Sequence, residues 1–331
     1  MKFKKCAALL LVSSCLLTGC TTSSAKKVDS KYVIASLEKG NKTKNIFADN
    51  LYKDIIDNSS NNSTVFNAVL QNLVDQKFPV NDDMKEDAAT IIKQIKSAYK
   101  SNYGDNYKDS LNQALTSAGY KNLSEYRQRM IKQIQYANFL LDYIDDHFDD
   151  VFNDYYQQCA PKYVSLIKIS VSDTSSPTDD ETSKLNEVKE LISNTDKSFG
   201  DIAQDYSDDS TSSKKGSLGI VDSKDTSGIA NSYGEDVFNA IEALSEGQVS
   251  DVITGDDGYY FVKVTSTDKK TLKKELKKTD IDSPLLAYDD YLQYVVYNSY
   301  KINYKDKDIK KIVQEVVNKA LEERKTERGE A

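Results

Sequence analysis

One stretch, residues 163–266, sets the architecture of this chain because it alone mixes strand patterns with helix patterns. It opens on the apolar run Tyr163–Ile169 and closes on Tyr259–Val264, both rich in the β-branched and aromatic residues typical of strands. Between them lie helical segments, a loop of serine, lysine and glycine, and a helix that ends at Glu246-Gly247. We therefore expect an α+β chain in which one α/β domain is inserted between N- and C-terminal helical segments.

The segment before this stretch, residues 31–160, has apolar side chains at helical spacing along most of its length. A short strand is expected first, at Tyr32–Leu37, with a turn at Gly40-Asn41. Apolar residues then recur every three or four positions, the spacing that gathers them on one face of a helix. Pro79 ends one such stripe, and the longest runs from Tyr126 to Ile144. These stripes predict helices that pack against each other.

The segment after the stretch, residues 269–331, is also helical in pattern. It begins rich in lysine and glutamate and is interrupted at Ser283-Pro284, since proline does not continue a helix. Amphipathic helices are expected beyond the break, at Leu285–Tyr300 and Ile309–Leu321. The remaining residues form a charged tail.

The N-terminus has the features of an export signal. Three lysines precede the apolar run Cys6–Leu17, which is too short to span a bilayer. The run ends in Leu17-Thr18-Gly19-Cys20, which resembles a bacterial lipobox. We expect cleavage after residue 19, lipidation of Cys20 with acyl chains such as palmitate, and a tether over residues 20–30. An ordinary secretory peptide that happens to end in Gly-Cys is the alternative.

Cysteine and histidine usage limits the chemistry available to the mature chain. Cys159 is the one cysteine left beyond Cys20, so no intramolecular disulfide can form, and a buried or inert thiol is expected rather than a nucleophile. The single histidine, His147, lies in the acidic stretch 142–154, which favours a solvated linker over a metal site. Ser-His-Asp and Cys-His catalysis are excluded, and we expect no metal and no cofactor.

The charge balance excludes nucleic acid as a partner. The precursor has 44 basic and 52 acidic residues, and loss of the signal lysines leaves 41 basic residues and a net charge of −11. Binding to phosphate backbones requires clustered basic charge, which this balance does not supply.

Four segments in order carry a resemblance to the parvulin peptidyl-prolyl isomerases. They are Phe199–Ser210, Lys215–Gly219, Val237–Asp251 and Gly258–Val264. A lipidated N-terminus and helical segments on both sides of such a domain further resemble the PrsA-type foldases. This resemblance implies a parvulin-like domain over residues 161–268, and N- and C-terminal helices that pack together into a mainly α chaperone domain.

The resemblance also places candidate site residues. Rotation about an X–Pro bond breaks no covalent bond, so an apolar cup for the proline ring beside a polar network suffices. The cup would use Ile229, Tyr233 and Phe238. Asp209 occupies the position of the acid or cysteine that faces the substrate amide, and Ser165 precedes the first-strand position.

The chain departs from the parvulin pattern at several positions. Parvulins place one histidine in the first strand and one in the last, where this chain has Leu166 and Tyr260. A leucine forms no hydrogen bond, and a tyrosine offers one hydroxyl in place of an imidazole. The loop has Lys215 and Ser217 where the pattern has a glycine and an acid. These changes predict weak or absent catalysis.

Two functions of different classes remain open. The first is a rotamase, a foldase that accelerates folding of exported proteins at the outer face of the cell membrane of a Gram-positive bacterium. The second is a non-enzymatic holding chaperone, and a surface adhesin or solute-binding lipoprotein is a third option. The expected partners are unfolded or partly folded exported polypeptides with X–Pro segments, and the lipid bilayer through Cys20. The sequence leaves a homodimer open.

Overall fold

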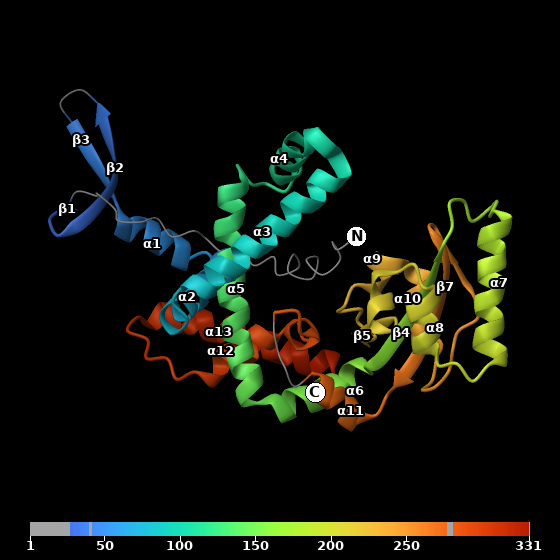
Figure 1. Ribbon diagram of the computed structural model, residues 1–331. Coiled ribbons are helices and arrows are strands. Elements are labelled where there is room, and N and C mark those ends of the chain that lie inside the picture. The colour runs from blue at the N-terminus through green and yellow to red at the C-terminus, as the bar shows by residue number, and fades with distance from the viewer. Residues whose placement is uncertain (1–26, 40–41, 277–280, 331) are drawn as a thin grey trace. The chain divides into compact units, whose positions relative to one another are not determined.

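The structure is a computed structural model that describes residues 27–39, 42–276 and 281–330 (Figure 1). The predicted signal peptide, the lipidation site Cys20 and the turn at Gly40-Asn41 lie outside the described residues. The predicted α+β class is confirmed, because helical N- and C-terminal segments flank a central domain built on a sheet.

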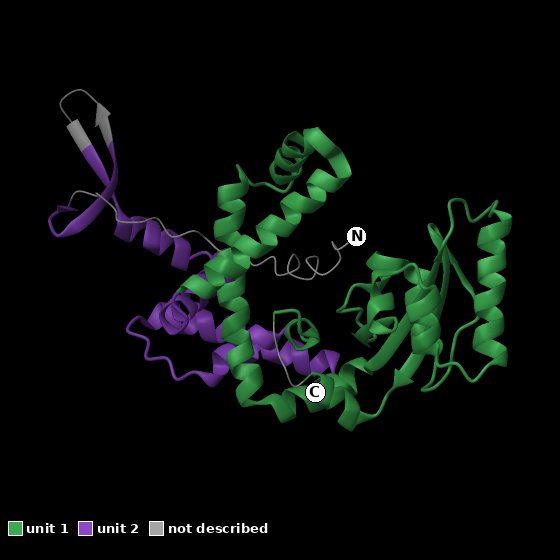
Figure 2. Cartoon of the chain, viewed as in Figure 1, with its two compact units in different colours: residues 1–11, 80–290 green, residues 12–79, 291–331 purple. Residues whose placement is uncertain are grey.

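The described part of the chain divides into two compact units (Figure 2). Unit 1 takes in residues 80–276 and 281–290, and unit 2 joins residues 27–39 and 42–79 to residues 291–330. The division at Pro79 falls inside the stretch that the sequence predicts as one N-terminal helical part.

Unit 2 begins with a small antiparallel sheet in the order β1-β2-β3. Its strands are β1 (Lys27–Val28), β2 (Lys31–Lys39) and β3 (Lys42–Phe47). The predicted strand Tyr32–Leu37 is the middle of β2, whereas the predicted tether extends into β1. Asp29 and Ser30 have φ values of 51° and 65°, the two positive angles that a two-residue hairpin turn needs.

Unit 2 continues with helices from both ends of the chain. They are α1 (Ala48–Ile56), η2 (Ser59–Asn61), α2 (Asn62–Lys77), α12 (Leu292–Ser299) and α13 (Lys307–Glu327). Helix α13 packs against α2 and α12. The ring of Phe66 on α2 stacks on Tyr294 of α12 with centroids 5.0 Å apart, and it meets Tyr297 edge-on at 5.1 Å. Aromatic packing therefore joins the two parts of the chain in this unit.

The first part of unit 1 is helical. Its elements are α3 (Asp82–Tyr103), η3 (Gly104–Asn106), α4 (Tyr107–Ser117), α5 (Leu123–Asp146) and α6 (Phe148–Cys159). Asparagines cap two of them, because the side chain of Asn81 accepts from the Met84 N–H and that of Asn122 from the Glu125 N–H. Cys159, at the end of α6, is buried, as predicted.

The acidic stretch 142–154 is helical, so its interpretation as a solvated linker is wrong. Helix α5 runs to Asp146, His147 forms the junction, and α6 follows directly. The apolar side chains Val151, Phe152 and Tyr155 of α6 are buried. Burial of these apolar side chains stabilises the helical structure. The carboxylates at 145, 146, 149 and 150 do not oppose it, because they remain exposed to solvent.

The helix predicted at Leu285–Tyr300 is interrupted. A short 3₁₀ turn, η5 (Pro284–Leu286), is separated from α12 by nonhelical residues. The carbonyl of Tyr288 accepts a hydrogen bond from Lys224 Nζ at 2.8 Å, and the Tyr288 hydroxyl donates to Asp154 at 2.9 Å. The first of these hydrogen bonds engages a backbone carbonyl that a continuous helix would use.

The second part of unit 1 is a four-stranded antiparallel sheet in the order β5-β4-β7-β6. The strands are β4 (Lys162–Ser170), β5 (Ser217–Val221), β6 (Ile253–Gly255) and β7 (Gly258–Ser266). One face is covered by α7 (Asp179–Asn194) and α8 (Phe199–Tyr206), and the other by α9 (Ile229–Tyr233) and α10 (Glu235–Ala243) (Figure 1). The 3₁₀ helix η4 (Ser210–Lys214) precedes β5, and α11 (Lys269–Glu275) follows β7.

Strand β4 is buried on both faces, in keeping with its nearly continuous apolar sequence. Val164 and Leu166 face α9 and α10, whereas Ile167 and Ile169 face α7 and α8. Gly216 lies against this strand with a φ of +75°, and a Cβ at that position would be 2.4 Å from the Leu166 carbonyl oxygen. Because side chains alternate along β4, those at odd and even positions lie on opposite faces of the sheet.

Candidate functional site

Five of the seven catalytic and substrate-binding residues predicted from the sequence meet on the α9/α10 face of the sheet. They are Leu166, Ile229, Tyr233, Phe238 and Tyr260. Leu166, Ile229 and Tyr260 are buried, and the half-buried Tyr233 and Phe238 pack against them. The arrangement is an apolar cluster whose outer members reach the surface of the domain.

Helix α9 is held in place by a carboxylate. Asp225 accepts hydrogen bonds from the Ile229 N–H at 2.5 Å and from the Ala230 N–H at 2.9 Å. Burial raises the pKa of the Asp225 carboxyl, and these two N–H donors act against that rise. The carboxylate at the start of α9 thus fixes Ile229 and Tyr233 relative to the sheet.

Asp209 lies at the edge of this cluster. It is half-buried at the start of η4, where Oδ1 accepts the Thr211 N–H at 2.8 Å. The Tyr233 hydroxyl reaches the same oxygen at 3.5 Å, the long limit for such a hydrogen bond. The rings of Tyr233 and Tyr260 meet edge-on with centroids 6.2 Å apart. Tyr233 therefore contacts both Asp209 and Tyr260 and links the two.

The hydroxyl of Tyr260 is already engaged by another carboxylate. It donates to Asp257 Oδ1, while Lys168 pairs with Oδ2 of the same carboxylate. The Lys168 ammonium also lies 5.6 Å from the centroid of the Tyr260 ring. Lys168 stands opposite Tyr260 in the β4–β7 register, which places the three groups together.

Both phenols at the site are neutral near pH 7. Burial is the main cause that raises the pKa of Tyr260, and the hydrogen bond to Asp257 adds to the rise. Burial also raises the pKa of Tyr233, together with the negative charge of Asp209. These side chains can donate hydrogen bonds, but they do not exchange protons as an imidazole does near neutral pH.

Gly255 makes room for the Tyr260 ring. A Cβ at this position of β6 would lie 2.7 Å from Cε2 of Tyr260, closer than such atoms approach. The ring therefore lies close to the end of β6, which pairs with β7 through Ile253 and Tyr260.

Ser165 is separated from the other predicted residues. As an odd position of β4 it lies on the opposite face of the sheet from Leu166, among Tyr163, Phe199 and Lys263. Leu166 itself is fully buried and has no polar atom in its side chain. The structure thus brings Asp209 beside the five clustered residues and leaves Ser165 apart.

Sequence reasoning missed Asp257, Lys168 and Gly255. The sequence contains a signal for the first two. Asp257 is the last residue of the turn before the final strand, and Lys168 is two residues from Leu166 in β4, which places both side chains on one face of the sheet. Gly255 carries no local signal, because its role depends on where the Tyr260 ring lies.

Metal binding and membrane spanning find no support in the described part of the chain. Among residues 27–39, 42–276 and 281–330, no three His, Cys, Asp or Glu side chains gather as a metal site would require. No described helix has the length and apolar character needed to cross a membrane.

Comparison with known families identifies the central domain. Residues 166–266 match the rotamase family, described as the PPIC-type PPIase domain. This part of the chain is a parvulin-type domain. Over 141 residues the chain is also 31% identical to the foldase protein PrsA of Staphylococcus epidermidis, and equally to that of a bovine strain of Staphylococcus aureus. The predicted resemblance to PrsA-type foldases and parvulins is confirmed.

These relatives are matched over part of their length. The alignment covers 40% of this chain and 41% of the Staphylococcus proteins. The solved PrsA of Bacillus subtilis is 22% identical, with 86% of this chain and 98% of that chain covered and a TM-score of 0.39. The chain therefore spans about two fifths of the length of the Staphylococcus proteins it matches.

Proposed function

We propose that this chain is a foldase that binds exported polypeptides while they fold, with a parvulin-type domain of weak or no isomerase activity. The observation that carries the proposal is the α9/α10 face. Its apolar cluster is complete, but the polar groups beside it are two neutral phenols and carboxylates that already accept hydrogen bonds. Anchoring through Cys20 at the extracytoplasmic face of the cell membrane belongs to the same proposal and rests on the sequence.

The chemistry available at this face is limited to binding and a single electrostatic effect. Amide resonance keeps the X–Pro bond planar and places negative charge on the carbonyl oxygen. A carboxylate such as Asp209 near that oxygen would disfavour the planar form relative to the twisted one. Stabilisation of the twisted form also requires hydrogen-bond donors placed where its charge develops. The Tyr260 hydroxyl does not meet this requirement, because it already donates to Asp257.

A purely holding chaperone is the second candidate, favoured by an apolar groove within unit 2. The groove has a volume of about 430 Å³. It lies between α1, α2 and the start of α13, with Tyr52, Ile55, Val69, Leu73 and Ile309 among its lining residues. Of the seven large apolar side chains that are exposed in the described residues, six lie between residues 32 and 55. Exposed apolar surface of this kind suits an unfolded client.

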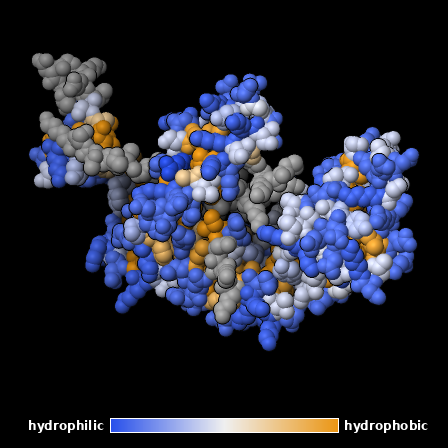
Figure 3. Space-filling model, viewed as in Figure 1, coloured by the Kyte–Doolittle hydropathy of each residue, from blue (hydrophilic) through white to orange (hydrophobic). Residues whose placement is uncertain are grey.

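Unit 2 also has solvent-exposed apolar side chains on its β2–β3 hairpin. Figure 3 shows hydrophobic surface on the β2–β3 hairpin, where Ile34 and Ile46 are each 47% exposed. Helix α1 follows this hairpin and has no buried residue at all. The hairpin and α1 thus supply contact area for apolar segments of a client.

A protease-coupled assay on a short X–Pro peptide tests the isomerase part of the proposal. We expect the full chain to accelerate isomerisation little, and Asp209→Ala to leave the rate unchanged. A strong acceleration that Asp209→Ala lowers by ~10²–10³-fold, as expected for loss of an electrostatic catalytic group, would instead establish an active rotamase. Circular dichroism of both proteins controls for folding.

A further inference from the structure

A cavity of about 400 Å³ lies on the sheet face opposite the parvulin-type site, where α8 begins. Three lysines contribute to its wall, namely Lys214, Lys215 and Lys263. The polar side chains of its wall carry ammonium or hydroxyl groups, all of which can donate hydrogen bonds. This excess of donors over acceptors is the property of a site for an oxyanion.

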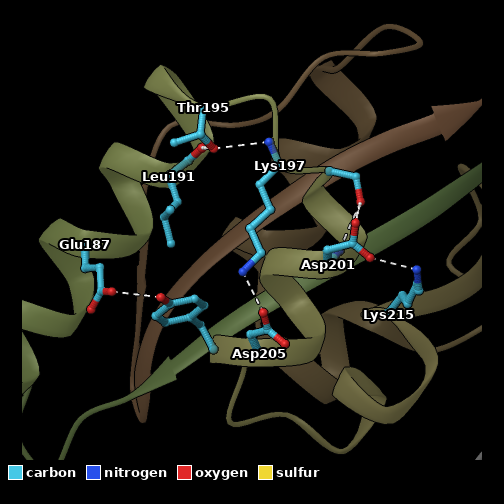
Figure 4. Close-up of polar contacts among 9 residues, drawn as sticks. Glu187, Leu191, Thr195, Lys197, Asp201, Asp205 and Lys215 are labelled. Atoms are coloured by element: carbon cyan, nitrogen blue, oxygen red, sulfur yellow. Dashed lines mark hydrogen bonds and ion pairs between the residues drawn. The ribbon is translucent and has the colours of Figure 1, made fainter.

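Two of the three lysines keep their charge available. Lys215 Nζ pairs with Asp201 Oδ1 at 2.7 Å, and Figure 4 shows this pair beside the separate pair of Lys197 and Asp205. Lys214 and Lys263 form no ion pair with any described residue. The charge of Lys215 is therefore compensated by Asp201, whereas the charges of Lys214 and Lys263 remain.

The hydroxyl of Ser165 is the buried polar group of this cavity. Ser165 is 7% exposed, lines the wall, and makes no side-chain hydrogen bond with another described residue. Because Ser165 lines the cavity, its hydroxyl remains available to donate to a group that enters there. Nearby, Ser217 and Tyr163 share one hydrogen bond of 2.9 Å, which leaves one hydroxyl proton of that pair to donate.

The first turn of α8 adds backbone donors. Ser198 caps the helix by accepting from the Asp201 N–H at 3.1 Å, whereas the N–H groups of Phe199 and Gly200 have no partner among the described residues. The positive end of the helix dipole favours an anion here. The stem of Lys215 lies on Gly200, where a Cβ would be 3.1 Å from the Lys215 Cβ.

We propose that this cavity binds a phosphate group, either free or carried by a phospholipid head group. Lys214, Lys263, Ser165 and the N–H groups at the start of α8 would surround its oxygens, a set of donors that a tetrahedral anion can use from several sides. Lys215 and Ser217, the two loop positions at which the chain departs from the parvulin motif, both line this wall. The site lies on the other face from the proposed foldase chemistry and is independent of it.

Calorimetric titration of the full chain with inorganic phosphate, at constant ionic strength, tests the proposal. Lys263→Gln and Ser165→Ala are each expected to weaken binding by about tenfold, since each removes a hydrogen bond to a charged group. Lys197→Gln is the matched control. It also removes one positive charge close to α8, but Lys197 does not line the cavity. It should change the affinity by less than about twofold. Lys214→Gln, at an exposed position, provides a variant that leaves the core intact.

Vesicles distinguish the two sources of the phosphate group. Flotation with phosphatidylglycerol vesicles, compared with phosphatidylcholine vesicles, is run on the same variants. Binding of inorganic phosphate that depends on Lys263 supports a free ligand, and binding to the anionic vesicles alone with the same dependence supports a head group. Absence of binding to both probes, or an equal loss in Lys197→Gln, would overturn the proposal.

Discussion

At the residue scale, the position of the Tyr260 ring follows from what surrounds it. Its hydroxyl donates to Asp257, its face receives the Lys168 ammonium, and its edge lies against Gly255. The tyrosine at the position of the expected histidine is therefore accommodated by a glycine and an acid that lie close to it in the fold. The sequence alone shows each of these residues but not their relation.

Gly255→Ala is expected to destabilise the protein by ~1–3 kcal/mol, because the added methyl group overlaps the Tyr260 ring. Chemical denaturation measures the change. The same substitution in a Tyr260→Val background should cost clearly less, since the ring carbon at 2.7 Å is gone. Equal costs in the two backgrounds would show that the ring is not what Gly255 accommodates.

At the element scale, α7 shows how a short sequence pattern determines where a helix begins. The Thr178 hydroxyl accepts the Glu181 N–H at 3.2 Å, and Glu181 Oε2 accepts the Thr178 N–H at 2.7 Å. Glu181 Oε1 also accepts the Ser172 N–H at 2.9 Å. These backbone donors, first that of Thr178, lower the pKa of Glu181 to about 2 from its usual 4.5. This capping box can be recognised in the sequence.

Glu181→Gln is expected to lower the melting temperature at neutral pH, and the loss should shrink in acid. The folded protein holds Glu181 ionised to a lower pH than the unfolded chain does, so the stabilisation is present above about pH 4.5 and is lost as the pH falls toward 2. Thermal melts of both proteins from pH 7 to 2.5 measure this difference. Glu190→Gln, an exposed glutamate on the same helix, is the control.

A gap in melting temperature that stays constant across this pH range would contradict the assignment. Thr178→Ala offers a second measurement, because removal of a threonine cap typically costs ~1 kcal/mol of stability.

At the scale of the whole molecule, unit 2 brings residues from both ends of the chain together. The Tyr52 hydroxyl donates to Asp306 Oδ2 at 2.5 Å, and Asp306 also caps α13. This hydrogen bond to Asp306 raises the pKa of Tyr52 to about 12. The apolar groove beside Tyr52 exists only when residues near 52 and near 309 are joined in one unit.

Ile55→Ser is expected to weaken suppression of client aggregation, because it removes an exposed apolar side chain from the groove of unit 2. Light scattering of a denatured client at equimolar chaperone measures the effect. Tyr103→Ser is the control, because Tyr103 is also large and exposed but lies on α3 in unit 1. Equal losses in the two variants, or no suppression by the wild-type chain, would exclude the groove as the holding surface.

The class of the fold and the central domain could be predicted from the amino-acid sequence. The apolar patterns of β4 and β7 and the order of the four motifs depend on residues that are close together in the sequence, so they can be read without the fold. That Ile229, Tyr233 and Phe238 lie in one apolar cluster was predictable for the same reason, since they occupy motif positions on α9 and α10.

Which polar groups contact each other depends on the three-dimensional fold. It separated Ser165 from Leu166 by strand alternation, joined Tyr260 to Asp257, and made helices of the acidic stretch at 142–154. It also placed the lysines of the cavity around the start of α8. Charge and hydrogen bonding act through distances between residues far apart in the chain, and packing of the apolar faces sets those distances.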